Sequence, residues 1–201
     1  MPLAAAIDSP TIITVSDRSD ASHWLAGLAC QHVELGVNGL GRRNVWAARL
    51  DEIVQTTHGR IILVAESVSC FAVAWWARLS PDAYVRNVAG ALLLDPLGGG
   101  TGPTLNLKHF SAPSTPLPFP ALVCTAATSA EAGAGAATLA TSWGSRFVHA
   151  AALDTILRGA DEGSAAEREL AVLLAAILRT DLPATVAIAP TIATDRREHA
   201  F

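Results

Sequence analysis

The stretch that decides the fold is Ile61–Leu79, which reads IILVAESVSCFAVAWWARL. Its first five residues are a short apolar run rich in β-branched types, and the residues from Val68 onward are apolar on every side of a helix, so a buried strand passes directly into a buried helix. Ser67 stands at the join. The positions two before and two after it, Ala65 and Ser69, are small, as a tight strand-to-helix turn requires. The pattern predicts a G-x-S-x-G nucleophile elbow with both glycines replaced; the alternative is a serine that caps a helix.

Length and composition favour one domain with a single large core. The chain has 201 residues, of which 51% are hydrophobic and 16% charged, and its formal net charge is -4. This balance argues against nucleic acid or an acidic membrane surface as a partner. A small-molecule substrate or ligand is expected, a protein partner stays open, and the oligomeric state is not predicted.

The cysteines and the N-terminus predict a cytoplasmic protein. Cys30, Cys70 and Cys124 have no CxxC spacing and lie in apolar segments, which favours buried reduced thiols over disulfides or a zinc site. The glycine cluster at 98–102 is not followed by Gly-Lys-Ser/Thr, so a nucleotide loop is not expected there. The sequence predicts no other cofactor and no metal site. The chain shows no basic, apolar leader, and no run of the roughly 18 to 20 apolar residues that a membrane span needs.

Strand and helix patterns alternate along the chain. Strands are expected at 11–15, 32–35, 61–65, 88–94, 121–125 and 146–151, and helices at 23–30, 44–54, 68–79, 130–143 and 164–179. The proline-rich and glycine-rich stretch 98–120 predicts a long ordered loop. We therefore expect one three-layer α/β domain over 1–201 with a mostly parallel sheet, frayed at 1–10 and 194–201.

Short motifs in this order and spacing resemble the small cap-less α/β-hydrolases of the YdeN type, the retinoblastoma-binding-protein-like serine hydrolases. The resemblance runs from about Thr11 to Ile177. The matching residues are Ser19 and His23-Trp24 in the first loop, Trp46 and Leu50 on the next helix, Glu66-Ser67-Val68-Ser69-Cys70 at the elbow, Pro118-Phe119-Pro120, and Ala140 to Gly144. The resemblance implies helices on both faces of the sheet and no cap domain.

The same resemblance implies the roles of individual residues. Ser67 takes the nucleophile position, and the backbone N–H of Val68 takes an oxyanion position. The family's first loop also borders the pocket; its residues here are Asp17, Arg18, Ser19, His23 and Trp24.

The chain departs from the family at both other triad positions. The family acid falls on Ser129, or on Thr128 if the register slips by one, and the family histidine falls on Thr155. The family also has glycines in its first loop. One of these positions falls near Val15 in this chain, and two others are occupied by Asp17 and Arg18. A serine hydroxyl needs a base near neutral pH, and the acid fixes the tautomer of that base, so Ser67 alone does not make a competent hydrolase.

Other residues offer replacements, each with a plainer alternative. Asp95 follows the strand after the elbow helix and is a possible surrogate acid, or a turn carboxylate before Pro96. Glu66 is expected to be exposed or salt-bridged. Further candidates for the base are His149, expected to point into a sheet face, His23, His109 and Asp154, whereas His32, His58 and His199 are expected at the surface.

Three functions remain open on the sequence. The first is a weak hydrolase of small esters or acyl compounds with relocated triad partners. The second is a non-hydrolytic enzyme, catalysing an elimination, isomerisation or cyclisation in a biosynthetic pathway, that uses the same pocket and oxyanion site. The third is a catalytically inactive binding or scaffold protein.

Overall fold

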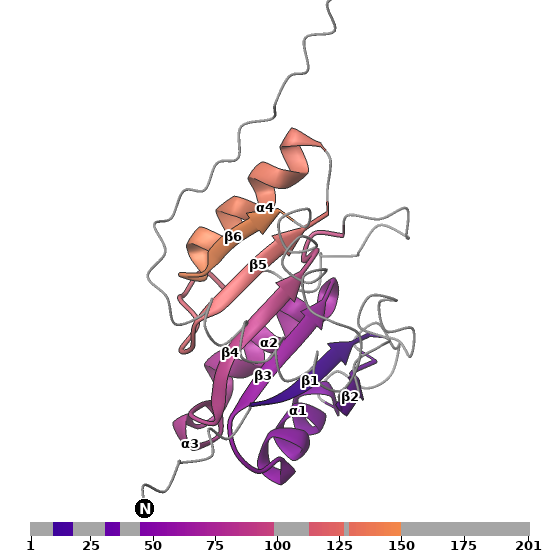
Figure 1. The fold of residues 1–201 in the computed structure, drawn as a ribbon, viewed down its shortest axis with the longest axis vertical. Helices are drawn as coiled ribbons and strands as arrows, with labels where there is room; N and C mark the ends of the chain where they lie inside the picture. The colour runs from indigo at the N-terminus through magenta and orange to yellow at the C-terminus, as the bar shows by residue number, and fades with distance from the viewer. Residues whose placement is uncertain (1–9, 18–30, 37–44, 99–112, 127–128, 150–201) are drawn as a thin grey trace, which may run out of the picture.

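The computed structural model describes residues 10–17, 31–36, 45–98, 113–126 and 129–149 (Figure 1). In chain order the elements are β1 (Thr11–Ser16), β2 (Gln31–Glu34), α1 (Val45–Thr56), β3 (Ile61–Glu66), α2 (Val68–Leu79), α3 (Asp82–Val85), β4 (Val88–Leu94), β5 (Ala121–Thr125), α4 (Ala130–Ser142) and β6 (Arg146–His149). The predicted strands and the helices at 44–54, 68–79 and 130–143 are confirmed to within two residues, apart from Asn44, which lies outside the described residues.

The strands form one parallel sheet in the order β2-β1-β3-β4-β5-β6. From β1 the chain moves to β2 on one side and then to β3 on the other side, so the order reverses between β1 and β3. In open α/β sheets, ligands bind outside the carboxyl ends of the strands at such a switch point. The topology therefore directs attention to the residues that follow β1 and β3.

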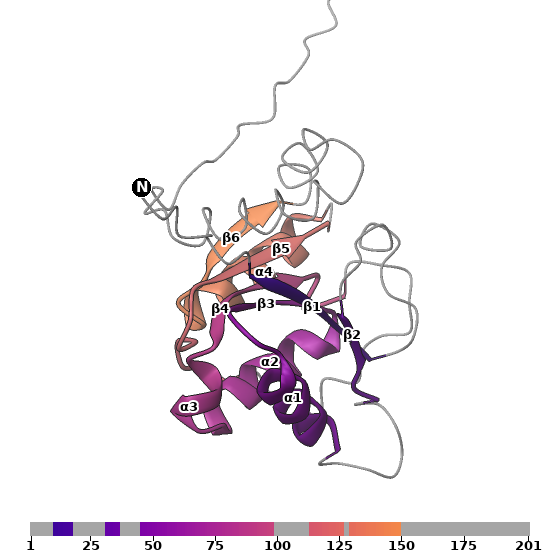
Figure 2. The ribbon, with the colours of Figure 1, turned by 60° about the horizontal axis from the view of Figure 1, so that its bottom comes forward.

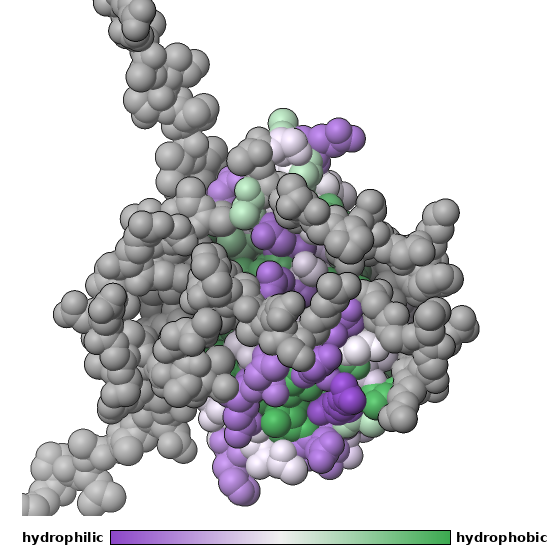
Figure 3. All heavy atoms as spheres, turned by 90° about the vertical axis from the view of Figure 1, so that its right-hand side faces the viewer, coloured by the Kyte–Doolittle hydropathy of each residue, from purple (hydrophilic) through white to green (hydrophobic). Residues whose placement is uncertain are grey.

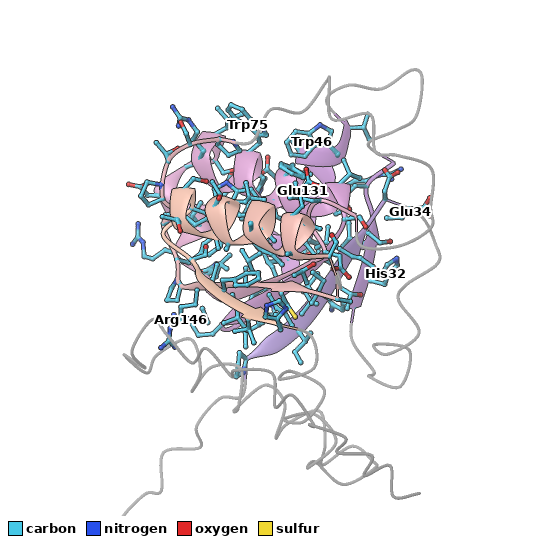
Figure 4. The ribbon with its side chains drawn as sticks, turned by 90° about the horizontal axis from the view of Figure 1, so that it is seen from above. His32, Glu34, Trp46, Trp75, Glu131 and Arg146 are labelled. Carbon is cyan, nitrogen blue, oxygen red and sulfur yellow. The ribbon has the colours of Figure 1, made fainter. Side chains whose placement is uncertain are left out.

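The four described helices pack on one face of the sheet (Figures 2 and 4). Alternate strand residues such as Ile13, Leu63 and Leu93 join the helix side chains in a single buried cluster. The side chains of the opposite face, among them Ile62 and Leu92, are buried as well. Burial on both faces explains why the strands read as continuous apolar runs. The predicted helices at 23–30 and 164–179 lie outside the described residues.

Two tryptophans anchor the helices to each other and to the chain before β5. The Trp76 indole N–H on α2 donates to an Asp51 carboxylate oxygen on α1 at 2.8 Å. The Trp143 indole N–H donates to the Pro113 carbonyl at 2.9 Å, and its ring meets Phe71 of α2 edge to face, with centroids 5.7 Å apart. Aromatic pairs of this geometry stabilise beyond the area they bury.

Replacing Trp143 by alanine is expected to lower the free energy of unfolding by about 3–5 kcal/mol, because a fully buried ring leaves a cavity and the Pro113 carbonyl loses its donor. Urea unfolding followed by circular dichroism measures the loss. Trp75, half-buried on α2 with the Arg78 guanidinium 6.0 Å from its ring centroid, is the matched control, and Trp75→Ala is expected to cost about 1 kcal/mol or less. Equal losses in the two variants would contradict this assignment of the core.

Candidate active site

Ser67 occupies a strained turn between β3 and α2. Its backbone has φ 53° and ψ -125°, a left-handed conformation that costs a non-glycine residue on the order of 1–3 kcal/mol. The Ser67 N–H donates to the Leu94 carbonyl at 2.9 Å, and the Ser67 carbonyl accepts from the Cys70 N–H at 3.1 Å. The Ser67 side chain makes no capping bond to the helix, so the capping alternative does not describe its role.

The residues around the turn are packed tightly enough to hold that conformation. Ala65 and Ser69 are fully buried, in agreement with the requirement for small residues where strand and helix approach. The Ser69 hydroxyl has no hydrogen-bond partner among the described residues. The Cys70 thiol donates to the carbonyls of Ala65 and Leu94, each at 3.4 Å.

Asp95 lies beside Ser67 at the end of the neighbouring strand. Glu66 and Leu94 are register partners, and the Ser67 N–H bonds to the Leu94 carbonyl, so Ser67 and Asp95 are the residues that follow two adjacent strand ends. Asp95 also has a positive φ, 42°, and among the described residues it and Ser67 are the two non-glycine residues with that conformation. Strained residues cluster at functional sites, and here two of them adjoin.

The Asp95 carboxylate ties β4 to β5. Its Oδ1 accepts from the Thr125 hydroxyl at 2.9 Å and from the Ala126 N–H at 2.7 Å. Its backbone N–H donates to the Cys124 carbonyl at 2.8 Å. These contacts fix the carboxylate at the carboxyl end of the sheet, so Asp95 has a structural task whether or not it also takes part in chemistry.

Asp17 follows β1, the strand that pairs with β3 on the side away from β4. The register of β1 with β3 runs to Val15, which lies opposite Ala65. Asp17, Ser67 and Asp95 thus follow three adjacent strands at one edge. Figure 3 shows the molecule from the side to which the strand arrows of Figure 1 point, and on it hydrophilic residues are interspersed with hydrophobic ones. Val68 begins α2 next to this row, and a backbone N–H of a first helical turn has no acceptor within its helix.

A family model described as serine hydrolase matches residues 15–164, which is more than half of the chain. The chain belongs to the serine hydrolase family. A solved structure described as a YdeN-like hydrolase from Pectobacterium atrosepticum is similar in fold, with a TM-score of 0.53 and 17% identity over 85% of this chain and 92% of that chain. No curated protein matches the sequence. The resemblance inferred from the elbow and its flanking motifs is confirmed, and with it the α/β-hydrolase-like fold.

Among the described residues, no imidazole lies beside the elbow serine. His149 ends β6, opposite Thr125, so three strand spacings of about 4.8 Å each separate it from Ser67. Its ring packs edge to face on Phe147, with centroids 5.1 Å apart, and lies close to Gly133 of α4. His149 therefore points into the helix-covered face, as predicted, and cannot serve as the base for Ser67.

The other described histidines are placed elsewhere. His58 is exposed in the turn before β3, at the opposite edge of the sheet. His32 on β2 is exposed, as predicted, yet both of its ring nitrogens contact hydroxyls of β1, Thr14 at 2.9 Å and Ser16 at 3.2 Å. The sequence did not reveal this cluster, because it depends on the pairing register of β1 and β2.

The family's acid position has a structural role in this chain. Ser129 caps the N-terminus of α4, and its hydroxyl accepts from the Ala132 N–H at 3.2 Å. Glu66 is half-buried at the end of β3 and alternates with Ala65, which directs it to the face away from the helices. The other predicted site residues lie outside the described residues: Arg18, Ser19, His23, Trp24, His109, Thr128, Asp154, Thr155 and His199.

No three His, Cys, Asp or Glu side chains among the described residues lie close enough to hold a metal ion. None of the described helices is long and apolar enough to cross a membrane.

Cys70, directly below the elbow, predicts an alkaline loss of stability. Burial raises the pKa of its thiol well above the ordinary 9.0, and the charges of Glu66 and Asp95 add to this rise. Above pH 9 the thiol ionises in the unfolded chain while it stays protonated in the folded one. The contribution of this thiol to the free energy of unfolding is therefore complete below pH 9, and it falls by about 1.4 kcal/mol per pH unit as the pH rises toward the pKa of the folded protein.

Denaturant unfolding of the wild type and of Cys70→Ala between pH 7 and pH 10 isolates this contribution. The difference in free energy of unfolding between the two is expected to be constant below pH 9 and to shrink above it. A difference that stays constant to pH 10 would show that the Cys70 thiol does not resist ionisation.

Proposed function

We propose that the protein is a divergent serine hydrolase acting on a small ester or another acyl compound, with Ser67 as nucleophile and Asp95 as the relocated acid. One observation carries the proposal: the two described non-glycine residues with positive φ, Ser67 and Asp95, follow neighbouring strands at the edge where α/β enzymes bind ligands. The family membership supports the reaction class.

In the proposed reaction the Ser67 hydroxyl oxygen attacks the acyl carbon. The Val68 N–H and the positive end of the 12-residue helix α2 stabilise the oxyanion that forms. The Asp95 carboxylate, already fixed by Thr125 and Ala126, orients the base and stabilises its protonated form. The base, which has accepted the Ser67 proton, passes it to the leaving group as that bond breaks, and water then hydrolyses the acyl-serine.

The base in this proposal comes from a part of the chain outside the described residues. His23, which matches a residue of the family's first loop, and His109 in the proline-rich segment are the proposed imidazoles, and Asp154 is the proposed carboxylate alternative. An imidazole suits the task best because its pKa lies near neutral pH.

A fluorophosphonate probe tests the proposal. Trypsin cleaves after Arg60 and Arg78, so the expected label lies on peptide 61–78, on Ser67 and not on Ser69. The variants His23→Gln, His109→Gln and Asp154→Asn identify the base as the residue whose loss slows labelling by about 10²-fold or more. Absence of label on Ser67 in a folded protein would overturn the proposal.

The replacement of the family's acid and histidine by Ser129 and Thr155 favours a second candidate, a non-hydrolytic enzyme of the elimination, isomerisation or cyclisation type. Such an enzyme needs the oxyanion donors of α2 to polarise a carbonyl, but no reactive serine. A catalytically inactive binding or scaffold protein is the third candidate. An unlabelled Ser67, together with formation of a pathway product that is lost when Val68 and its neighbours are substituted, would support the non-hydrolytic enzyme. An unlabelled Ser67 and a product that these substitutions leave unchanged would support the binding or scaffold protein.

A cytoplasmic location forms part of the proposal. Cys70 and Cys124 are both buried thiols outside any disulfide, which fits a reducing compartment. The proposed partner is a small-molecule substrate.

A further inference from the structure

A second serine in this protein has the imidazole that Ser67 lacks. Ser16 is the last residue of β1, and its hydroxyl lies 3.2 Å from Nε2 of His32 on the adjacent strand β2. The other ring nitrogen, Nδ1, lies 2.9 Å from the Thr14 hydroxyl. Figure 4 shows His32 next to Glu34 at one side of the sheet.

The Gln31 carbonyl favours one tautomer of His32 in the hydrogen-bonded array formed by Thr14, His32 and Ser16. The Thr14 hydroxyl donates to that carbonyl at 3.3 Å, so its oxygen is available to accept from Nδ1–H of His32. In that tautomer Nε2 carries no proton and accepts from the Ser16 hydroxyl. The order Ser16–His32–Thr14 is then a nucleophile, a base and a group that orients the base, the arrangement that marks an activated hydroxyl.

The position of the array also suits a ligand. Ser16 ends the strand at which the sheet order reverses, the place where α/β proteins bind ligands. Thr14 and Ser16 are buried, whereas His32 is exposed and reaches solvent. Glu34 of β2 pairs with Ser16 in register, so a carboxylate-bearing residue follows His32 by two positions on the same face of that strand.

We infer that Ser16 and His32 form a second reactive pair, which accepts an acyl group from a small activated ester independently of Ser67. The Ser16 oxygen forms a bond to the acyl carbon, the bond between that carbon and the leaving oxygen breaks, and the Ser16 proton passes to His32 Nε2 and on to the leaving oxygen. Because Ser16 is 7% exposed, the pair takes small acyl groups, and water reaches the product slowly. The pair therefore holds one acyl group with little turnover.

Acetylation by p-nitrophenyl acetate, mapped by tandem mass spectrometry, tests this inference. Ser16 lies on the tryptic peptide that ends at Arg18, separate from the Ser67 peptide. We expect one acetyl group on Ser16 in the wild type and in Ser67→Ala. His32→Gln is expected to slow acetylation of Ser16 by about 10²-fold. His58→Gln, which removes an exposed imidazole at the opposite edge, is the matched control and is expected to change nothing.

Three results would overturn the inference. One is a wild type in which Ser16 stays unmodified while other nucleophiles react, and another is a folded His32→Gln variant that acetylates Ser16 at the wild-type rate. The third is Ser16 acetylation that vanishes in Ser67→Ala, which would show transfer from Ser67 instead of an independent pair. Failure of Ser67 to react with the fluorophosphonate leaves the Ser16 result unaffected, so the two proposals fail separately.

Discussion

Ser67→Ala is expected to turn over small acyl esters at least about 10³-fold more slowly than the wild type, because the nucleophile is lost while the oxyanion donors remain. Alanine has the same backbone preferences as serine at φ 53°, so the fold and its stability should change little. Steady-state hydrolysis of a chromogenic ester measures the loss.

Ser142→Ala is the matched control for Ser67. Its hydroxyl donates to the Leu139 carbonyl at the end of α4, remote from the elbow in the sheet order. Its activity should equal that of the wild type. A Ser67→Ala variant that keeps its hydrolytic rate would place the chemistry elsewhere and favour the non-hydrolytic or binding alternatives.

Asp95→Asn carries the second large effect, a fall in kcat of about 10³- to 10⁴-fold. Asparagine keeps an oxygen that can accept from Thr125 and Ala126, so the turn at φ 42° survives while the negative charge is removed. Steady-state kinetics and urea unfolding are measured on the same preparation.

Two further variants separate chemistry from structure at Asp95. Asp95→Ala is expected to lose activity and also about 1–3 kcal/mol of stability, because the Ala126 N–H and the Thr125 hydroxyl lose their acceptor. Asp51→Asn, whose carboxylate accepts from Trp76 between two helices, should leave activity unchanged. If Asp95→Asn is fully active, Asp95 is a turn carboxylate only.

The order of elements could be predicted from the sequence because burial controls it. Strands β3, β4 and β5 are covered on both faces, so each appears as a continuous apolar run that local chain statistics detect. The elbow was predictable for a similar reason, since a tight turn permits only small residues such as Ala65 and Ser69 beside Ser67.

The partners of Ser67 and Ser16 could not be predicted in the same way, because they depend on contacts across strands. Asp95 reads as a residue before a proline, and its positive φ and its bonds to the end of β5 arise only when the sheet forms. His32 reads as a polar residue on an edge strand; its contacts with Thr14 and Ser16 require the register of β1 with β2. Ser129 stands at the family's acid position, but in this chain it caps the N-terminus of helix α4.

The roles of Ser67 and Asp95 are tested together by the rate at which a fluorophosphonate labels Ser67, mapped to peptide 61–78 in the wild type and in Asp95→Asn. We expect a label on Ser67 in the wild type and at least about 10²-fold slower labelling in the variant, since the base loses the carboxylate that orients it. An unlabelled Ser67 in the folded wild type, or equal rates in the two proteins, would contradict these roles.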